Sequence, residues 1–413
     1  MDKTHRQVII IGGGPAGLAA AAALKENGVS DILILERERR LGGILNQCIH
    51  DGFGLTRFGE SFSGPEYAKK FMDRVRELDI EAICNCTVIG LTGEKEVTAA
   101  MPGKLLRLTA DAIILTMGCR ERPRGALSIP GDRPAGVFTA GVAQSYVNLK
   151  NTMVGKEAVI LGSGDIGMIM ARRLTLEGVK VKAVFELQPY PSGLPRNIEQ
   201  CLNDYGIPLF LSHTVTRING RSRLESVTVS EVDENLKPIP GTEQVWPCDT
   251  LILSVGLIPE NELSLQAGVE LDPRTKGAVV DEHHQTTVPG IFAAGNVLHV
   301  HDLVDFVSLE AEELAASVKQ YLESGLTGCG IPVETDGSVS YTVPQRISGQ
   351  QDVTLSFRPR RPMQNCVFEV WQGDTLLAKK RVPKALPAVM VHIPVKTLKM
   401  VSKDPVKVVS RID

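Results

Sequence analysis

The sequence of 413 residues predicts an α/β protein in which one βαβ unit occurs twice, followed by an all-β domain at the C-terminal end. The first observation behind this prediction is an internal repeat with an offset of 150 residues. It superimposes Gly12, Gly14, Gly17, Gly28 and Glu36 on Gly162, Gly164, Gly167, Gly178 and Glu186. The second observation is that the sequence pattern changes after residue 330 to short predicted β-strands separated by prolines.

Each copy of the repeat reads as a strand, a glycine-rich turn, a helix and a second strand. The first strands are the apolar runs 8–11 and 159–161, each followed by GxGxxG and a helix rich in small apolar residues. The first glycine of such a motif permits a tight turn, the second lets a pyrophosphate approach the backbone, and the third allows close helix packing. The helix N-termini, which include Pro15 and Ala16 in one copy and Asp165 in the other, would hold phosphates through their N–H groups. Two Rossmann-like dinucleotide-binding domains are therefore expected.

The acids that end the two units indicate which dinucleotide each unit binds. Glu36 and Glu186 lie 24 residues after the first glycine, where a carboxylate accepts hydrogen bonds from a ribose diol. No arginine directly follows Glu186, so the second unit is expected to prefer NAD over NADP. In the first unit Gly42 and Gly43 come soon after the acid and offer backbone without side chains to a flavin nucleotide. The first unit is therefore predicted to bind FAD.

Length and composition narrow the class of protein. At roughly 150 residues per domain the chain holds two to three domains, and 43% apolar with 23% charged residues is an ordinary globular composition. A net charge of −3 argues against nucleic-acid binding, which needs a basic surface. The longest apolar stretch, residues 8–24, contains four glycines and a proline and is too short to span a membrane. The chain opens on charged residues rather than a signal peptide, so a cytoplasmic protein with reduced thiols and no membrane insertion is expected.

These motifs resemble those of the pyridine nucleotide-disulfide oxidoreductase superfamily over residues 6 to about 325. In that family an NAD(H) domain is inserted in a split FAD domain. The resemblance implies further cofactor-binding residues in this sequence: Val88 at the adenine after a strand at 83–87, Gly118 and Gly256 at the crossings between the domains, and Gly295 with Asn296 in the late flavin motif 287–296. The family usually has Asp at the position of Asn296, and a neutral amide can still donate and accept hydrogen bonds.

The redox disulfide of that superfamily is missing from this sequence. No CxxxxC follows Gly43, and no CxxC occurs in the second unit. Cys48 alone could act as a redox thiol near the flavin if its pKa were lowered, and the alternative is a packing residue. Cys84 and Cys86 are read as packing residues of a strand rather than as metal ligands. No metal site is expected.

A narrower resemblance joins the segments 41–55, 118–122 and 295–305 to a subgroup without the disulfide. This subgroup contains FAD subunits encoded beside anaerobic glycerol-3-phosphate dehydrogenases, and FAD subunits of opine and dye-linked proline dehydrogenases. It implies a hetero-oligomer, in which electrons pass between NAD(H) and a second flavin-containing subunit, and in which a further partner is a small cysteine-rich subunit. Two alternatives remain open. One is a stand-alone NADH oxidase or peroxidase using Cys48, and the other is a scaffold subunit that binds nucleotides without turnover.

Several side chains beside the flavin motif are candidates for catalysis. The spacing of apolar residues predicts a helix over 302–322, capped by Asp302 or Asp305, with its N-terminus toward the flavin. Just before it, His299 and His301 are read as flavin-facing or proton-relaying groups, or as structural hydrogen-bonding residues, and no nearby acid is seen that would complete a metal site. Gln47 is expected either to touch the flavin ring or to pack. His283 and His284 precede a turn and are expected at the solvated surface.

The expected domains are residues 1–120 with 270–328 for FAD, 121–269 for NAD, and 330–413 for a β sandwich. Strands in the last domain are predicted at 339–343, 353–357, 367–371, 375–379, 388–393 and 406–410, with a hairpin turn at 372–374. Residues 331–413 contain 13 Lys and Arg against 7 Asp and Glu, net +6, while residues 1–330 contain 32 against 41, net −9. The basic residues, which include Arg358, Arg360 and Lys379, are read as a solvated or intramolecular docking face, or as a subunit interface.

Overall fold

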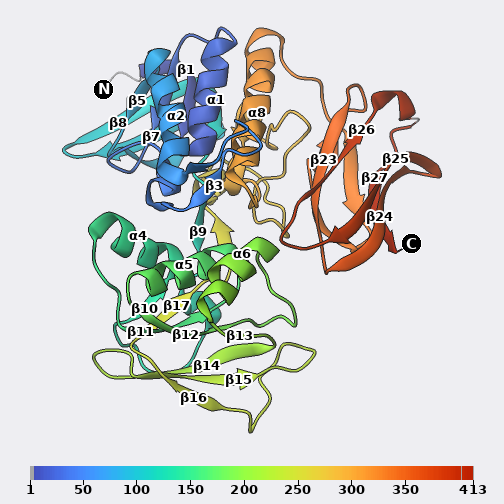
Figure 1. The fold of residues 1–413 in the computed structure, drawn as a ribbon. Coiled ribbons are helices and arrows are strands. Elements are labelled where there is room, and N and C mark those ends of the chain that lie inside the picture. The colour runs from blue at the N-terminus through green and yellow to red at the C-terminus, as the bar shows by residue number, and fades with distance from the viewer. Residues whose placement is uncertain (1–3, 401, 413) are drawn as a thin grey trace. The chain divides into compact units, whose positions relative to one another are not determined.

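The computed structural model describes residues 4–400 and 402–412, which form two compact units (Figure 1). The first unit contains residues 1–119 and 259–413, and the second contains residues 120–258. The chain crosses from one unit to the other on two paired strands, β9 (Cys119–Glu121) and β18 (Leu257–Pro259). No helix in the described part of the chain is long and apolar enough to cross a membrane.

The core of the first unit is a seven-stranded sheet with the order β5-β2-β1-β8-β7-β6, with β19 also paired to β8. The strands are β1 (Thr4–Ile11), β2 (Ile32–Leu35), β5 (Glu81–Ile83), β6 (Thr87–Leu91), β7 (Glu96–Met101), β8 (Lys104–Leu115) and β19 (Ile291–Ala293). The long strand β8 is parallel to β1 and β19 and antiparallel to β7. A strand of a doubly covered sheet must be apolar on both faces, and β1 satisfies this condition: Val8 and Ile10 pack into one core while Ile9 and Ile11 pack into the other.

Helices cover this sheet and bring distant parts of the chain together. The three longer ones, α1 (Pro15–Glu26), α2 (Gly64–Glu77) and α8 (Val304–Ser324), lie side by side in Figure 1, and α1 contacts both of the others. The shorter elements are η1 (Gly43–Gln47), β3 (Asp51–Phe53), β4 (Phe62–Ser63), α7 (Glu262–Gln266) and η3 (Gly295–Val297). Because α8 packs on α1, Gly295 comes close to Ala16 in the first turn of α1.

The second unit repeats the same design around a five-stranded sheet with the order β10-β17-β11-β12-β13. Its strands are β10 (Val137–Thr139), β11 (Glu157–Leu161), β12 (Lys180–Phe185), β13 (Leu209–Phe210) and β17 (Thr250–Leu253), all parallel. A second, antiparallel sheet contains β14 (His213–Asn219), β15 (Ser226–Glu231) and β16 (Gln244–Pro247). The helices are α3 (Arg124–Leu127), α4 (Ala140–Lys150), α5 (Asp165–Leu176), α6 (Pro195–Cys201) and η2 (Asn203–Tyr205).

The C-terminal part of the chain is a β sandwich, as the sequence predicts. One sheet has the order β22-β20-β27-β24-β25 and the other the order β21-β23-β26, and they share one core. The elements are β20 (Ile331–Thr335), β21 (Val339–Val343), β22 (Arg346–Ile347), β23 (Val353–Pro359), β24 (Met363–Gln372), β25 (Thr375–Ala385), β26 (Val391–Val395), η4 (Thr397–Lys399) and β27 (Val406–Ile412). All six predicted strands correspond to strands of the structure, and the turn at 372–374 closes the β24–β25 hairpin. Strands β20 and β22 were not predicted.

Three expectations about local structure are wrong. The chain returns to the first unit at Pro259 rather than at 270, because Leu263, Ala267 and Val269 pack into the core beneath β6 and β7. The strand expected at 83–87 is interrupted by a bend in which Asn85 has a φ of 51°, so Cys84 and Cys86 do not lie on a strand. His283 is not at the surface, since it is 4% exposed.

Candidate functional site

The first glycine-rich turn has a different steric requirement at each of its three glycines. Gly12 has a φ of 110°, and a Cβ there would lie 2.5 Å from the carbonyl oxygen of Thr116. A Cβ on Gly17 would lie 1.9 Å from the carbonyl oxygen of Gly12. A Cβ on Gly14 would meet only the Cα of Gly43, at 4.0 Å. The first and third glycines are therefore required by the fold, whereas the second keeps open the space that a pyrophosphate needs at the N-terminus of α1.

Glu36 is buried at the end of β2, with both carboxylate oxygens turned toward backbone N–H groups. Gly13 donates to Oε2 at 2.7 Å, and Glu38 donates to Oε1 at 2.7 Å. A carboxylate has about four lone-pair positions, so each oxygen can still accept a bond from a ribose hydroxyl. The carboxylate is thus oriented by the turn that would bind the phosphates of the same nucleotide.

The second unit reproduces this arrangement at an offset of 150 residues. Gly162 has a φ of 102°, and Ser163 and Gln188 donate their backbone N–H groups to Glu186 at 3.0 and 2.9 Å. The hydroxyls of Ser163 and Ser192 add two further bonds to Oε2, at 2.6 and 2.8 Å. The repeat read from the sequence is therefore a repeat of hydrogen bonds as well as of residues.

The remaining glycines of the second turn, and Asp165, also have clear surroundings. A Cβ on Gly167 would lie 2.6 Å from the carbonyl oxygen of Gly162, whereas one on Gly164 would have 3.7 Å to its nearest neighbour. Asp165 opens α5 and accepts bonds from the backbone of Leu194 at 2.7 Å and from the side chain of Asn197 at 2.6 Å. This acid anchors the segment before α6, while its predicted cofactor contact stays a prediction.

The Gly42–Gly43 turn lies directly against the first dinucleotide turn. Gly42 donates its N–H to the carbonyl of Gly13 at 2.8 Å, and a Cβ on Gly43 would lie 3.0 Å from the Cα of Gly14. Asn46 closes the turn with bonds from its amide to the carbonyls of Leu41 and Gly43 at 2.9 and 3.2 Å. The adjacent Gln47 is 8% exposed. The two turns approach each other backbone to backbone, which glycines without side chains allow.

Gly118 and Gly256 lie at the crossings that the resemblance implies, whereas Val88 lies inside a strand and not after one. Val88 is in β6, where it pairs with Ala99. Gly118 has a φ of 73° and Gly256 a φ of 98°, and a Cβ on either one would meet nothing within 4 Å. Both glycines are needed for their backbone conformation at the crossings between the units. Their contacts with nucleotides remain predictions.

The late flavin motif is held by an acid that the sequence did not indicate. Glu310, on α8, accepts the backbone N–H of Gly295 at 2.6 Å through Oε2. Its Oε1 lies 2.7 Å from Nε2 of His299 and 3.5 Å from Nε2 of His301. Asn296 contributes from the other side, since its side-chain oxygen accepts the backbone N–H of His301 at 3.0 Å. The sequence signal for Glu310 is weak, because it depends on which face of the helix packs against the glycine.

The side chains of His299 and His301 are buried. The side chains of His299 and His301 are 1% and 3% exposed. Burial lowers the pKa of His299 to about 4, so this residue does not titrate near neutrality as a proton relay would. Burial opposes ionisation of Glu310, but the two histidines hold the pKa of its carboxyl well below the ordinary value. The catalytic role of His301 stays a prediction, and its nearest acidic partner is Glu310.

The expectation that no acid lies near the His-x-His pair is wrong. His299, His301 and Glu310 offer ligand atoms within 4.8 Å of one another, so the set could hold a metal ion. The distance of 2.7 Å between imidazole and carboxylate is that of a hydrogen bond, which already accounts for the burial of this pair. We therefore interpret Glu310 as a positioning residue for the Gly295 loop.

The expected capping role of Asp302 or Asp305 is also wrong. Helix α8 begins at Val304, and the residue before it, Leu303, makes no side-chain cap. Asp305 instead points away from its own helix terminus and accepts the backbone N–H groups of Gly54, Thr56 and Arg57 at 3.0, 3.0 and 2.8 Å. It therefore fixes the loop after the Gly42–Gly43 region to α8.

The surroundings of Cys48 are opposite to those of a redox thiol. Its Sγ lies 3.4 Å from the carbonyl oxygen of Ile44, and burial raises the pKa of the thiol to about 12. A nucleophilic or redox-active cysteine needs a lowered pKa, because the thiolate is the reactive form. The structure thus favours the packing role for Cys48.

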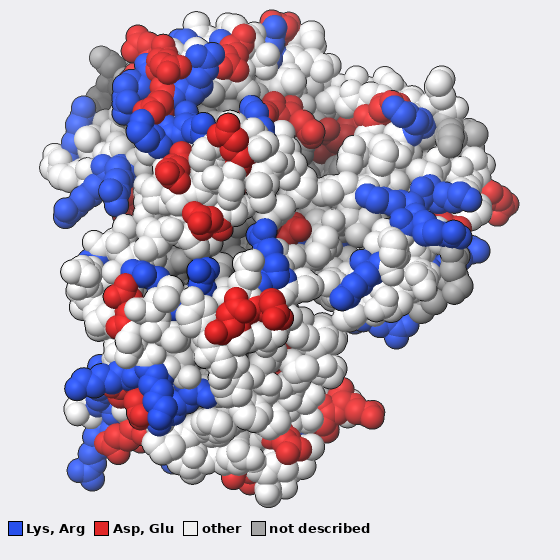
Figure 2. All heavy atoms as spheres, viewed as in Figure 1, with Lys and Arg blue, Asp and Glu red and all other residues white. Residues whose placement is uncertain are grey.

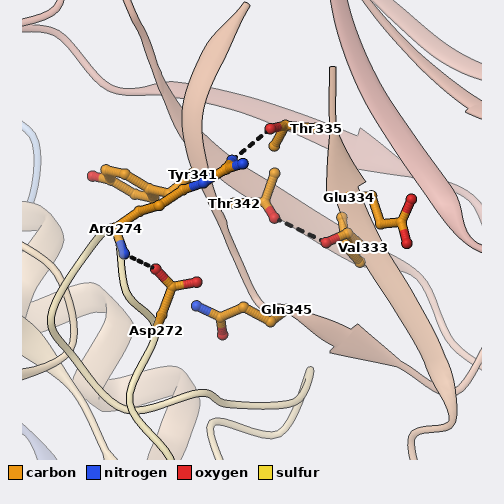
Figure 3. A pocket seen from close by; sticks show the side chains of 8 residues that line it. All are labelled: Asp272, Arg274, Val333, Glu334, Thr335, Tyr341, Thr342 and Gln345. Atoms are coloured by element: carbon orange, nitrogen blue, oxygen red, sulfur yellow. Dashed lines mark hydrogen bonds between the residues drawn. The ribbon is translucent and has the colours of Figure 1, made fainter. Parts of the chain in front are cut away.

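A cavity of about 300 Å³, lined by no residue of either glycine-rich turn, lies between residues 272–274 and strands β20 and β21 (Figure 3). Arg274 lines it and donates to the hydroxyl of Thr335 at 2.6 Å, while the backbone N–H of Arg274 donates to Asp272 at 2.7 Å. These two charged side chains are thus engaged with neighbouring groups, and the cavity contains none of the predicted site residues.

Comparison with known proteins agrees with this geometry. The model of the family described as pyridine nucleotide-disulphide oxidoreductase matches residues 6–320. The hydrogen cyanide synthase subunit HcnB of Pseudomonas protegens is 28% identical over 70% of this chain, which spans 65% of that protein. An opine oxidase subunit from Rhizobium meliloti is 27% identical, with 70% of this chain and 58% of that protein covered. The glutamate synthase [NADPH] small chain of Escherichia coli is 26% identical, with 78% of this chain and 70% of that protein covered.

Two solved structures share the fold. Thioredoxin reductase from T. acidophilum has a TM-score of 0.63 and 23% identity, with 76% of this chain and 98% of that chain covered. L-proline dehydrogenase from P. horikoshii has a TM-score of 0.55 and 20% identity, with 79% of this chain and 57% of that chain covered.

Proposed function

The chain belongs to the pyridine nucleotide-disulphide oxidoreductase family, and from this premise we propose that it is the FAD- and NAD(H)-binding subunit of a multi-subunit catabolic dehydrogenase. In this role it transfers hydride between NAD(H) and its flavin, and passes electrons between that flavin and a second flavin-containing subunit. The substrate class we propose for the complex is glycerol 3-phosphate or a similar small catabolic substrate.

The matched pair of turns is the observation that carries this proposal. One chain contains two glycine-rich turns, each with a buried acid that accepts an N–H of its own turn, Gly13 to Glu36 and Ser163 to Glu186. Members of the family bind FAD and NAD(P)H. Hydride exchange between a nicotinamide and a flavin needs two dinucleotide sites. The two copies of the internal repeat would supply these sites.

The residues of the first unit fit FAD. Gly14 leaves room for a phosphate, the Gly42–Gly43 turn removes side chains from the adjoining path, and Glu36 is oriented to accept ribose hydroxyls. The bound flavin supplies the acceptor for hydride. The protein's part is positioning: Glu310 fixes the Gly295 backbone, and Asp305 fixes the loop 54–57.

The second site favours NAD over NADP by charge. Glu186 presents a buried carboxylate, which would repel a 2′-phosphate. The residues that follow it, Leu187 and Gln188, carry no positive charge.

Two facts support a separate subunit in the role of electron partner. The sequence has neither the CxxxxC nor the CxxC pair of the disulfide reductases, so electrons must leave the flavin by another route. The relatives named above, HcnB, the opine oxidase protein and the glutamate synthase small chain, are by their names parts of larger enzymes.

An anaerobic titration of the purified chain with NADH tests the proposal. We expect about one equivalent of NADH to bleach the flavin absorbance, and glycerol 3-phosphate to bleach it only when the dehydrogenase subunit is co-expressed. Glu186→Gln should retain FAD but require more NADH, whereas Glu36→Gln should lose FAD. Each variant is the control for the other.

Other outcomes would support the alternatives. Retained FAD that NADH does not bleach would favour a nucleotide-binding scaffold. Turnover of oxygen or peroxide by the isolated chain, abolished in Cys48→Ser, would favour a stand-alone oxidase or peroxidase. The raised pKa of Cys48 leads us to expect that Cys48→Ser reduces artificial acceptors as fast as the wild type does.

A further inference from the structure

A second cluster of titratable side chains lies outside the dinucleotide sites, where the turn 281–285 meets the linker that follows α8. Glu282 and His283 come from the turn, and Cys329 comes from the linker. Their ligand atoms all lie within 4.8 Å of one another. The side chains of Glu282 and His283 are 1% and 5% exposed, so water does not easily satisfy them.

Several acidic groups meet in this cluster. The thiol of Cys329 faces the carboxyl groups of both Asp281 and Glu282. Among the ion pairs of the described residues, none brings a lysine or arginine to Asp281 or Glu282. Ionised groups in a buried position need a cation, either a side chain or a metal.

An unsatisfied ring nitrogen is aimed into the same space. Nε2 of His283 is buried without a hydrogen-bond partner and lies 4.0 Å from Oε1 of Glu282. An imidazole nitrogen without a partner is costly in a buried position, unless something at that point binds it. Its neighbours are a carboxylate and a thiol, so the missing partner is one that all three can share.

The surrounding contacts orient these side chains as outer ligands of a metal site do. Ser348, in the β sandwich, donates its backbone N–H to Oε2 of Glu282 at 3.0 Å and its hydroxyl to Oε1. Asp281 accepts the backbone N–H groups of His283 and Gln285 at 2.9 and 3.0 Å, which fixes the turn. Such second contacts hold metal ligands in place.

We propose that Glu282, His283 and Cys329 bind one zinc ion. Thiolate, imidazole and carboxylate are the three ligand types that Zn²⁺ takes, at about 2.0 to 2.3 Å, and a mixed set of this kind suits zinc better than magnesium or calcium. Asp281 faces the same thiol from outside this set of three ligands. Binding displaces the thiol proton to solvent as the Zn–S bond forms, with no change in oxidation state.

The ion would have a structural role. It would join the turn 281–285 to the linker 325–330, and through Ser348 to the β sandwich. Such a site is independent of the proposed function, because none of its ligands belongs to a dinucleotide turn.

The test is the zinc content of the full chain, purified without a histidine tag from cells grown with zinc. We expect about one zinc per chain by elemental analysis, and a thiolate-to-cobalt charge-transfer band after exchange of zinc for Co²⁺. Cys329→Ser should lose the band, and His283→Asn should lose the metal. Cys248→Ser is the matched control, because Cys248 is a buried thiol of the second unit that lies outside this cluster. The Cys248→Ser variant should keep its zinc.

Retention of FAD shows in each variant that the first unit is folded. If Cys329→Ser does not retain FAD, the wild type decides the question: after chelation, Cys329 should be alkylated at least tenfold faster than in the presence of Zn²⁺. A wild-type chain that contains no zinc, gives no cobalt band and shows equal alkylation with and without Zn²⁺ would overturn the proposal.

Discussion

At the scale of single residues, the glycines of the first turn separate folding from binding. Gly14 has an extended backbone, and a Cβ there meets nothing closer than 4.0 Å, whereas a Cβ on Gly17 meets a carbonyl oxygen at 1.9 Å. We expect Gly14→Ala to keep the stability of the apoprotein and to weaken FAD binding about tenfold or more, or about 1.4 kcal/mol. Gly17→Ala should lower the free energy of unfolding by about 1–3 kcal/mol.

Urea unfolding and flavin titration measure these two effects. The equivalent variants of the second unit, Gly164→Ala and Gly167→Ala, are controls that should leave FAD affinity unchanged. A Gly14→Ala chain that binds FAD normally would show that the phosphates do not approach this backbone.

The buried His299 makes stability depend on pH. Its pKa in the fold is about 4, lowered by burial, against about 6.5 in the unfolded chain. Between these values the unfolded chain binds a proton that the folded chain does not, so stability falls as the pH falls from about 6.5 toward 4. The groups that face His299 include Glu310, His301 and Arg358.

The measurement is the free energy of unfolding in urea at several pH values, for the wild type and His299→Gln. The variant lacks this titration, so its curve should fall less steeply over that range, with a difference of up to about 1.4 kcal/mol for each pH unit. Parallel curves would mean that His299 is not buried in its neutral form.

At the scale of elements, α8 is tied to the loop 54–57 by one carboxylate. Asp305 is 1% exposed and accepts three backbone N–H groups. Asp305→Asn replaces one acceptor oxygen by an NH₂ group that faces these donors. We expect a loss of about 1–3 kcal/mol in the free energy of unfolding, measured by urea denaturation.

Asp73→Asn is the control for that variant. Asp73 makes ion pairs with Lys69 and Arg76 on the exposed face of α2, and surface ion pairs contribute between 0 and about 1 kcal/mol. Equal losses in both variants would contradict the clamping role of Asp305.

The elements that could be predicted from the sequence are those whose signal is local. The glycines and acids of both repeats have fixed spacing, and the strand at 339–343 was predicted with the bounds it has in β21. Strand β20 could not be predicted because Pro332 interrupts its sequence pattern. The bend at Asn85 could not be predicted because only the left-handed backbone of that residue reveals it. Glu310 and Cys329 were missed for a different reason. The contact of Glu310 depends on which face of α8 packs against Gly295, and Cys329 meets Glu282 and His283 only in the folded chain.

At the scale of the whole molecule, the basic character of residues 331–413, in contrast to the acidic rest of the chain, is visible on the protein surface. Basic side chains gather over the β sandwich in Figure 2. Among the basic residues of this domain, Lys379, Lys380 and Lys384 are exposed on the edge strand β25. Charges on an edge strand prevent pairing with other sheets. Arg358 is different, because it donates to the carbonyls of Val300 and Ala388, the first at 2.9 Å, and so ties the sandwich to the segment before α8 in the same unit.

The division of the chain into two units predicts that they unfold separately. Each unit has its own hydrophobic cores, and the chain passes between them only twice. The two tryptophans of the sequence report on different parts: Trp246 packs on Phe185 and Phe210 in the second unit, while Trp371 lies in β24 of the sandwich. In a Trp371→Phe variant, tryptophan fluorescence therefore reports on the second unit alone, and flavin absorbance reports on the first.

We expect urea to give two transitions at different midpoints in this variant, one seen by Trp246 and the other by release of FAD. NAD at about 100 times its dissociation constant should stabilise the second unit by about 2.7 kcal/mol, and so shift the Trp246 transition without moving flavin release. The Glu186→Gln variant is the control, because weaker binding should reduce that shift. Coincident transitions that move together with NAD would instead mean that the units unfold as one cooperative body, in which nicotinamide binding is coupled to the stability of the flavin site.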